Sequence, residues 1–214
     1  MKLQILTLIL GPVDTNTYIL YDEDSKKALI IDPAGCGQAI LEQIEENQLN
    51  VDAILITHGH FDHIQAVDKL REALGVPAYA TRPEAKMAAD PFLNASAMLP
   101  QDEWLHCTIK HYIEDLADDL DMLDFGWIKI EVINTPGHTG GHVSFVEPTS
   151  SSIFVGDCIF KGGIHGRVDL PTSNPEDLKA TIKLLFKKFA AETKVYSGHG
   201  EATTIGEEKK FYER

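Results

Sequence analysis

The chain has 214 residues, with 19 Lys and Arg against 33 Asp and Glu, and its formal net charge is −14. Its 43% hydrophobic and 24% charged residues are ordinary for a globular protein, which excludes disordered and fibrous classes and predicts a single domain over residues 1–214. Nucleic acid and anionic membranes carry the same sign of charge, so neither is expected as a partner.

The cysteines and the N-terminus indicate a cytoplasmic protein. Cys36, Cys107 and Cys158 are odd in number, widely spaced and without a CxxC motif, which fits a reducing compartment. The first apolar run lacks the basic segment and small-residue cleavage site of a signal peptide. No apolar stretch reaches the roughly 20 residues that a membrane span requires, so we expect a soluble protein.

The first part of the chain begins with alternating apolar residues and then changes to helical spacing. The expected strands are 2–10, 17–21, 28–31, 53–56 and 78–80, and the expected helices are 38–48 and 64–74. The residues from about 83 to 123 have no sustained period and predict helix and loop. We expect 84–123 to cover the site, with Phe92, Met98, Trp104 and Tyr112 as candidate substrate contacts.

The last part returns to strands and ends with a helix and one more strand. The expected strands are 127–134, 143–146, 153–155 and 194–196. Ser173 or Asn174 caps a helix that begins with Pro175 at its first position. Because strands followed by helices occur twice, two similar αβ halves packed sheet to sheet are expected, an α/β (α+β) fold.

Histidines are concentrated in loops that follow apolar strands. The loop 57–63 reads THGHFDH and offers His58, His60, Asp62 and His63 within six residues. Without a cation, three imidazoles and a carboxylate packed this closely would suffer repulsion and desolvation, so the loop predicts a metal site with room for two ions.

One loop cannot complete such a site, and later loops offer further ligands. His138 lies in TPGHTGG, Asp157 follows Val155-Gly156, and His199 lies between two glycines. Each of these three residues, taken alone, also fits an ordinary polar loop or turn. Their assignment as ligands therefore depends on the first loop.

The motif THGHFDH resembles the THxHxDH signature of the metallo-β-lactamase fold superfamily, and His138, Asp157 and His199 follow in the order of its later motifs. Within it, TPGHT and Gly156-Asp157 look like the glyoxalase II group of hydroxyacylglutathione hydrolases. The ending of the chain is similar to short bacterial glyoxalase II-like hydrolases. The resemblance implies a four-layer αβ/βα sandwich with two metals between the sheets at one edge.

The same resemblance implies the ligand sets. His58, His60 and His138 would hold one ion, Asp62, His63 and His199 would hold the second, and Asp157 would bridge both. Two Zn²⁺ are expected, with iron or manganese as substitutes. Asp32, at a strand end, resembles the acidic residue that hydrogen-bonds the metal loop, although an ordinary turn aspartate is an equal alternative.

Two adjacent divalent ions would lower the pKa of a bridging water and present hydroxide at neutral pH. Asp62 is a candidate catalytic residue that orients this hydroxide, although as a direct ligand it would be a weak base. The expected reaction is hydrolysis of a small-molecule acyl thioester such as S-lactoylglutathione. Arg167 resembles the basic residue that meets glutathione carboxylate, with pairing to Asp169 as the alternative, and His165 is a further candidate substrate contact.

We expect two departures from glyoxalase II, namely a missing C-terminal helical region with basic residues and the presence of Gly200 after His199. An alternative function is a mononuclear iron persulfide dioxygenase that uses His58, His138 and Asp157. A β-lactamase-type site with Cys158 as a ligand, a nuclease and an inactive metal-stabilised binding module are further alternatives. The acyl group, the thiol and the oligomeric state are left open.

Overall fold

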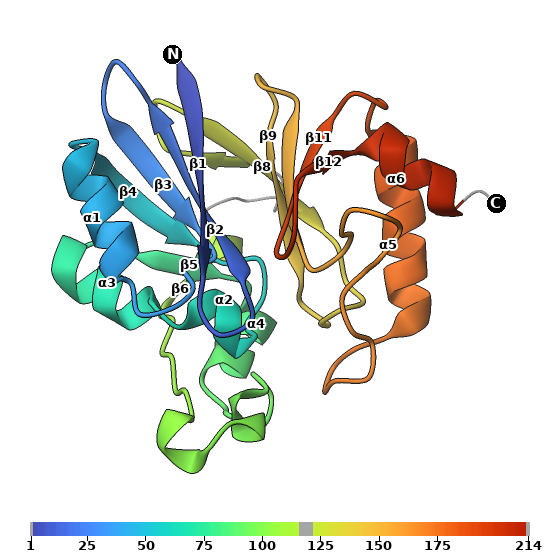
Figure 1. Ribbon diagram of the computed structural model, residues 1–214, viewed down its shortest axis with the longest axis horizontal. Helices are drawn as coiled ribbons and strands as arrows, with labels where there is room; N and C mark the ends of the chain where they lie inside the picture. The colour runs from blue at the N-terminus through green and yellow to red at the C-terminus, as the bar shows by residue number, and fades with distance from the viewer. Residues whose placement is uncertain (1, 116–121, 213–214) are drawn as a thin grey trace.

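The computed structural model describes residues 2–115 and 122–212, and two six-stranded sheets face each other at its centre (Figure 1). The first sheet, in spatial order, consists of β1 (Leu3–Leu10), β2 (Thr15–Asp22), β3 (Lys27–Ile31), β4 (Asn50–Leu55), β5 (Ala78–Ala80) and β6 (His111–Tyr112). The second consists of β12 (Thr203–Thr204), β11 (Lys194–Ser197), β10 (Ser152–Gly156), β9 (Val143–Glu147), β8 (Lys129–Asn134) and β7 (Met122–Asp124).

Helices cover the outer face of each sheet. In Figure 1, α1 (Gln38–Glu46) and α3 (Val67–Leu74) lie outside the first sheet, and α5 (Pro175–Lys188) and α6 (Ile205–Tyr212) lie outside the second. The short helices are α2 (Phe61–Ile64), α4 (Arg82–Ala88) and the 3₁₀ turns Ser96–Met98, Gln101–Glu103 and Ile113–Asp115. The expected four-layer αβ/βα sandwich is confirmed.

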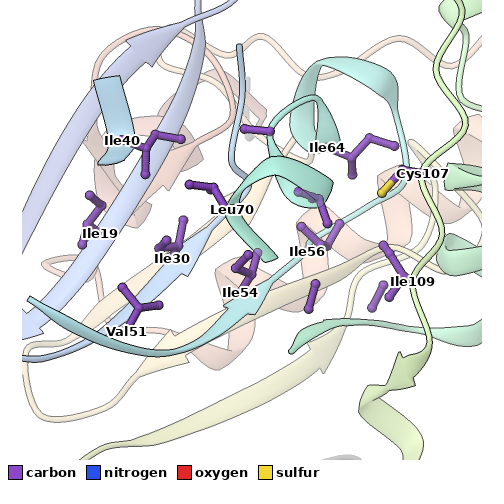
Figure 2. Packing of buried hydrophobic residues seen from close by; sticks show 14 of the residues in the cluster. Ile19, Ile30, Ile40, Val51, Ile54, Ile56, Ile64, Leu70, Cys107 and Ile109 are labelled. Atoms are coloured by element: carbon purple, nitrogen blue, oxygen red, sulfur yellow. The ribbon is translucent and has the colours of Figure 1, made fainter. Parts of the chain in front are cut away.

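Alternation along the central strands explains the layers. In β3, Ala28 and Ile30 face the cluster under α1 and α3, whereas Leu29 and Ile31 face the space between the sheets. Figure 2 shows the outer cluster, where Ile30 and Ile54 from the sheet lie near Ile40 and Leu70 from the helices. Strands buried on both faces read as continuous apolar runs, which is the pattern of this part of the sequence.

The second sheet is built in the same way. Phe154 of β10 packs between the sheets, whereas Ile153 and Val155 on either side of it pack under α5. The helix α5 begins as predicted, because the Asn174 side chain accepts hydrogen bonds from the backbone N–H groups of the first turn.

Some elements differ from the sequence-based expectations. The helix predicted over 64–74 is divided into α2 and α3, because the Ala66 N–H donates to the Pro33 carbonyl (3.0 Å) and leaves the helical ladder. The strand β6, the strand β7 and the helix α6 had no distinct sequence signal. Residues 116–121 of the expected cover lie outside the described residues.

No helix in the described part of the chain is both long enough and apolar enough to cross a membrane.

Candidate metal centre

The structure brings all seven candidate metal ligands together at one edge of the sandwich. His58, His60 and His138 form one group, and Asp62, His63 and His199 form another, with the potential ligand atoms of each group within 4.8 Å of one another. These residues follow β4, β8 and β11, or lie in α2 directly after β4. Strand ends therefore bring together side chains that lie far apart in the sequence.

Asp157 lies between the two groups, directly after β10. Its Oδ1 is 3.3 Å from His63 Nε2, and its Oδ2 is 3.5 Å from His138 Nε2 and 3.6 Å from His199 Nε2. Asp62 completes the second group, since its Oδ2 is 3.3 Å from Nε2 of both His63 and His199. One carboxylate thus reaches ligands of both groups, which is the geometry of a bridge between two ions.

Hydrogen bonds at Nδ1 fix the orientation of the imidazoles. The Nδ1 of His63 contacts Asp32 Oδ2 (3.0 Å), the Nδ1 of His138 contacts the Arg167 carbonyl (2.7 Å), and that of His199 contacts the Val13 carbonyl (3.1 Å). In each ring Nε2 is left facing the centre. Partners of this kind commonly set the tautomer and orientation of metal-binding histidines.

Several buried polar atoms at the centre lack a hydrogen-bond partner among the described residues. The buried Nε2 atoms of His58, His60 and His63, together with Asp157 Oδ1, have no hydrogen-bond partner in the described part of the chain. Buried polar atoms are rarely left without a partner, and neutral imidazole nitrogen with carboxylate oxygen is a donor set that divalent zinc and iron accept. The residues present therefore fit a metal centre.

The electrostatics divide the cluster into two halves. Burial, followed by repulsion from His138, lowers the pKa of His60 to about 3, so this imidazole is neutral and able to bind a metal. Burial also lowers the pKa of His199, but its contacts with Asp157 and Asp62 outweigh burial and raise the pKa to about 10. Burial opposes ionisation of Asp62, yet the adjacent His63 and His199 hold its pKa well below its usual range.

Asp32 supports the first loop from the end of β3. Its Oδ1 accepts from the Thr57 N–H (2.8 Å), and its Oδ2 accepts from the Thr57 hydroxyl (2.6 Å) and contacts His63 Nδ1 (3.0 Å). The prediction that Asp32 hydrogen-bonds the metal loop is confirmed. Because Asp32 is buried and all these contacts are direct, it holds the loop and one ligand at the same time.

Gly198 permits the close approach of β11 to the centre. A Cβ atom at this position would overlap Asp157 Oδ1 and lie 2.7 Å from His63 Cε1. The backbone conformation of Gly198 is not the left-handed one, so the constraint is steric. The glycine before His199 is therefore required by space within the metal centre.

Two buried residues near the ligands were missed in the sequence. Glu84 of α4 accepts hydrogen bonds from the Gly59 N–H, the Gly141 N–H and the Thr139 hydroxyl, each at 2.8 Å. It thereby joins the loop of His58 and His60 to the loop of His138. A single glutamate on a short helix carries no motif, so no sequence signal pointed to it.

His142 is the second missed residue. Its ring stacks on that of His58, with centroids 5.0 Å apart, and its Nδ1 contacts the Thr135 hydroxyl at 2.9 Å. The ring packs behind a proposed ligand, and His142 belongs to none of the potential ligand groups among the described residues. Its spacing of four residues from His138 was the available signal.

The other candidate residues lie around the centre in different roles. Arg167 and His165 both line the cavity at the metal ligands, but Arg167 forms a two-point ion pair with Asp169 (2.9 and 2.8 Å). The Cys158 thiol is buried and 3.4 Å from the Thr135 carbonyl, and burial raises its pKa to about 12. Cys158 belongs to none of the potential ligand groups among the described residues, which disfavours the alternative of Cys158 as a ligand.

The four candidate contacts in the 84–123 segment are also separated. Met98 lines the cavity. Phe92 packs edge-on against Trp104, with ring centroids 5.3 Å apart. Tyr112 packs beneath the Arg82 guanidinium instead, 4.2 Å from the ring centroid. Only Met98 of these four is among the residues that line the cavity in the described structure.

Comparison with known proteins identifies relatives over almost the whole chain. Among curated proteins, the chain is 38% identical over 195 residues to "Probable metallo-hydrolase YqgX" of Bacillus subtilis (strain 168), covering 91% of this chain and 89% of that protein. It is 32% identical over 204 residues to "Hydroxyacylglutathione hydrolase GloC" of Haemophilus influenzae, covering 91% and 90%.

Solved structures are also similar to this chain over almost its whole length. The structure of the B3 metallo-beta-lactamase BLEG-1 is similar to this chain, with a TM-score of 0.89 and 36% identity over 97% of both chains. TTHA1623, in a di-iron-bound form, matches with a TM-score of 0.80 and 33% identity over 96% of this chain and 98% of that chain. The family model described as the Metallo-beta-lactamase superfamily matches residues 10–200. With its His/Asp metal-binding cluster, the chain belongs to the metallo-beta-lactamase superfamily.

Proposed function

We propose that this protein is a dinuclear metal-dependent hydrolase of acyl thioesters. His58, His60 and His138 would hold one ion, and the second would be held by Asp62, His63 and His199, with Asp157 between them. The observation that carries the proposal is the convergence of buried Nε2 atoms and carboxylates around Asp157. The similarity to a protein named as a hydroxyacylglutathione hydrolase supports the thioester class.

Two bound divalent ions would supply a water of lowered pKa and would polarise the acyl carbonyl. The protein residues keep the donor atoms in place and the carboxylate ligands ionised. Asp62 Oδ2 accepts from the Thr15 hydroxyl (2.8 Å), and its low pKa keeps it an anion. An anion that strongly disfavours protonation is a good ligand but a weak base, so we assign Asp62 to metal binding and to orienting the nucleophile rather than to proton transfer.

The alternative of a mononuclear iron dioxygenase would use His58, His138 and Asp157 alone. It would leave Asp62, His63 and His199 as a second cluster without an ion, although Asp62 Oδ2 lies 3.3 Å from Nε2 of both histidines. A complete second group favours the dinuclear site. We propose zinc as the metal, with iron or manganese as substitutes; the similarity to a protein with a di-iron-bound form supports iron as a substitute.

We also propose a cytoplasmic location and a small-molecule partner rather than nucleic acid or membrane. The three cysteines are free, with Cys107 and Cys158 buried and Cys36 exposed, as is usual in a reducing compartment. The net charge of −14 disfavours polyanionic partners.

The proposed function can be tested by metal analysis combined with turnover assays. Purified wild-type protein is expected to contain about two metal ions per chain and to hydrolyse acyl thioesters. Asp157→Ala is expected to lose much of the metal and to lower kcat/KM by about 100-fold or more. Asp124→Asn, at the exposed end of β7, serves as the control. An unaltered metal content in Asp157→Ala would refute the bridge. One iron per chain together with oxygen consumption would support the dioxygenase alternative. Turnover of nitrocefin would support the β-lactamase alternative.

A further inference from the structure

The cavity that opens onto the proposed metal ligands has an apolar rim. It has a volume of about 260 Å³, and its apolar lining residues are Val13, Phe61, Ala95, Met98, Phe160 and Leu170. Val13 is 46% exposed and Met98 is 63% exposed. Large apolar side chains left in solvent beside an open site are typical of a ligand-contact surface.

The protein backbone holds this rim in place. The Val13 carbonyl accepts a hydrogen bond from Nδ1 of His199, and both residues line the cavity. On the other side, the Phe61 N–H donates to the Asn94 carbonyl (2.9 Å), which ties the segment that carries Met98 to the first ligand loop. The rim is therefore attached to both proposed ligand groups.

Asn94 is itself anchored inside the protein. It is buried, and its side-chain amide donates to the Ala88 carbonyl (3.0 Å) and to the Leu105 carbonyl (2.9 Å). The Met98 N–H donates to the Ala95 carbonyl at 3.1 Å and closes a short turn on this anchor. Met98 is thus exposed on a segment whose backbone is fixed.

Lysine and arginine side chains offer little free positive charge to a substrate in this cavity. Arg167 is the only Lys or Arg among the residues that line it in the described structure. Its guanidinium already forms two hydrogen bonds with the Asp169 carboxylate, which compensates its charge. A thiol with several carboxylates would find no unpaired lysine or arginine here.

The apolar surface continues beside the centre. A neighbouring cavity of about 440 Å³ shares Phe160 and His199 with the first and is lined by Ile164, which is 60% exposed. An aliphatic chain bound at the metal centre could therefore extend along Phe160. Three of the large apolar side chains that are exposed in the described structure, Val13, Met98 and Ile164, adjoin the same site.

We infer that the thioester substrate carries an aliphatic chain that packs between Val13 and Met98, and that the site does not depend on gripping carboxylates of the thiol. This inference rests on the proposed thioester hydrolase function and specifies its substrate class. The chain belongs either to the acyl group or to the thiol, and these two sources are separated by the test.

The test uses two series of synthetic thioesters with the metal-loaded protein. In the first, N-acetylcysteamine carries acetyl, butanoyl or hexanoyl groups; in the second, acetyl is joined to ethane-, butane- or hexanethiol. In at least one series, kcat/KM should rise about two- to fourfold for each added methylene, because each partly leaves water on binding. Val13→Ser and Met98→Ser should each reduce the ratio of kcat/KM for the longest substrate to kcat/KM for the shortest by about threefold or more.

Leu184→Ser is the matched control, because Leu184 is similarly exposed (46%) but lies on α5 and lines neither cavity. It should keep the wild-type ratio. The series in which kcat/KM rises with chain length identifies whether the acyl group or the thiol carries the aliphatic chain. A kcat/KM that does not change with chain length in either series, or a marked preference for S-lactoylglutathione, would overturn the inference and leave the proposed hydrolase function intact. No turnover of any thioester by protein with two metals would overturn both.

Discussion

Glu84 offers a sharp test of how the ligand loops are held. The substitution Glu84→Gln keeps one carbonyl oxygen for the Thr139 hydroxyl and the Gly141 N–H, but it places an amide donor opposite the Gly59 N–H. One buried donor then loses its acceptor, which costs about 1–3 kcal/mol of unfolding free energy. Burial raises the pKa of Glu84, and removing the carboxylate offsets part of this cost, so we expect about 1–2 kcal/mol.

Metal affinity should respond more strongly than stability. Gly59 lies between His58 and His60, so a displaced Gly59 moves two proposed ligands at once. Loss of supporting contacts of this kind typically reduces metal affinity by about 10- to 100-fold. The assay is a zinc titration against a competing chelator, combined with urea unfolding of the metal-free protein.

Glu147→Gln is the matched control. Glu147 is also buried and accepts hydrogen bonds from Thr149 and Ser150, but it lies at the far end of β9 in the β9–β10 turn. We expect it to lower stability by a similar amount and to leave zinc affinity unchanged. Equal effects of the two variants on zinc affinity, or none from Glu84→Gln, would refute the assignment of Glu84 as the link between the ligand loops.

Three further predictions concern space, protons and charge. Gly198→Ala should lower zinc affinity by about 10-fold or more in a competition titration. Gly140→Ala is the control, because its Cβ would meet nothing closer than 3.7 Å, and it should leave zinc affinity unchanged. The pKa of His199 is raised to about 10, so the protonated ring stabilises the metal-free protein fully below pH 6.5, and this stabilisation is lost as the pH rises through 10. Zinc binding at pH 8 should therefore release about one proton or more. Calorimetry in buffers of different ionisation enthalpy measures this release, and the absence of any release would contradict the prediction. Asp169→Ala frees the Arg167 guanidinium and should lower KM for S-lactoylglutathione by up to about fivefold, and an unchanged KM would show that Arg167 does not reach the substrate.

The sequence by itself determined the chemistry of the centre. His58, His60, Asp62 and His63 are so close in the chain that their interaction is local, and a dense cluster of imidazole and carboxylate has few stable arrangements without a cation. The apolar runs also predicted the layers, because strands buried on both faces carry few polar positions. For the same reason the two sheets with outer helices could be predicted.

Only the tertiary structure decided which distant residues support the ligands. Glu84 acts through donors on two loops that lie 25 and more than 50 residues away, and neither periodicity nor a motif encodes that contact. The split between α2 and α3 has a similar cause, since the Ala66 N–H is taken by Pro33 from another loop. The pairing of Arg167 with Asp169 is local, yet its effect on substrate charge depends on which other cations line the cavity. Hydrogen bonds and charge compensation between distant segments exist only after folding, and they leave no periodic trace in the chain.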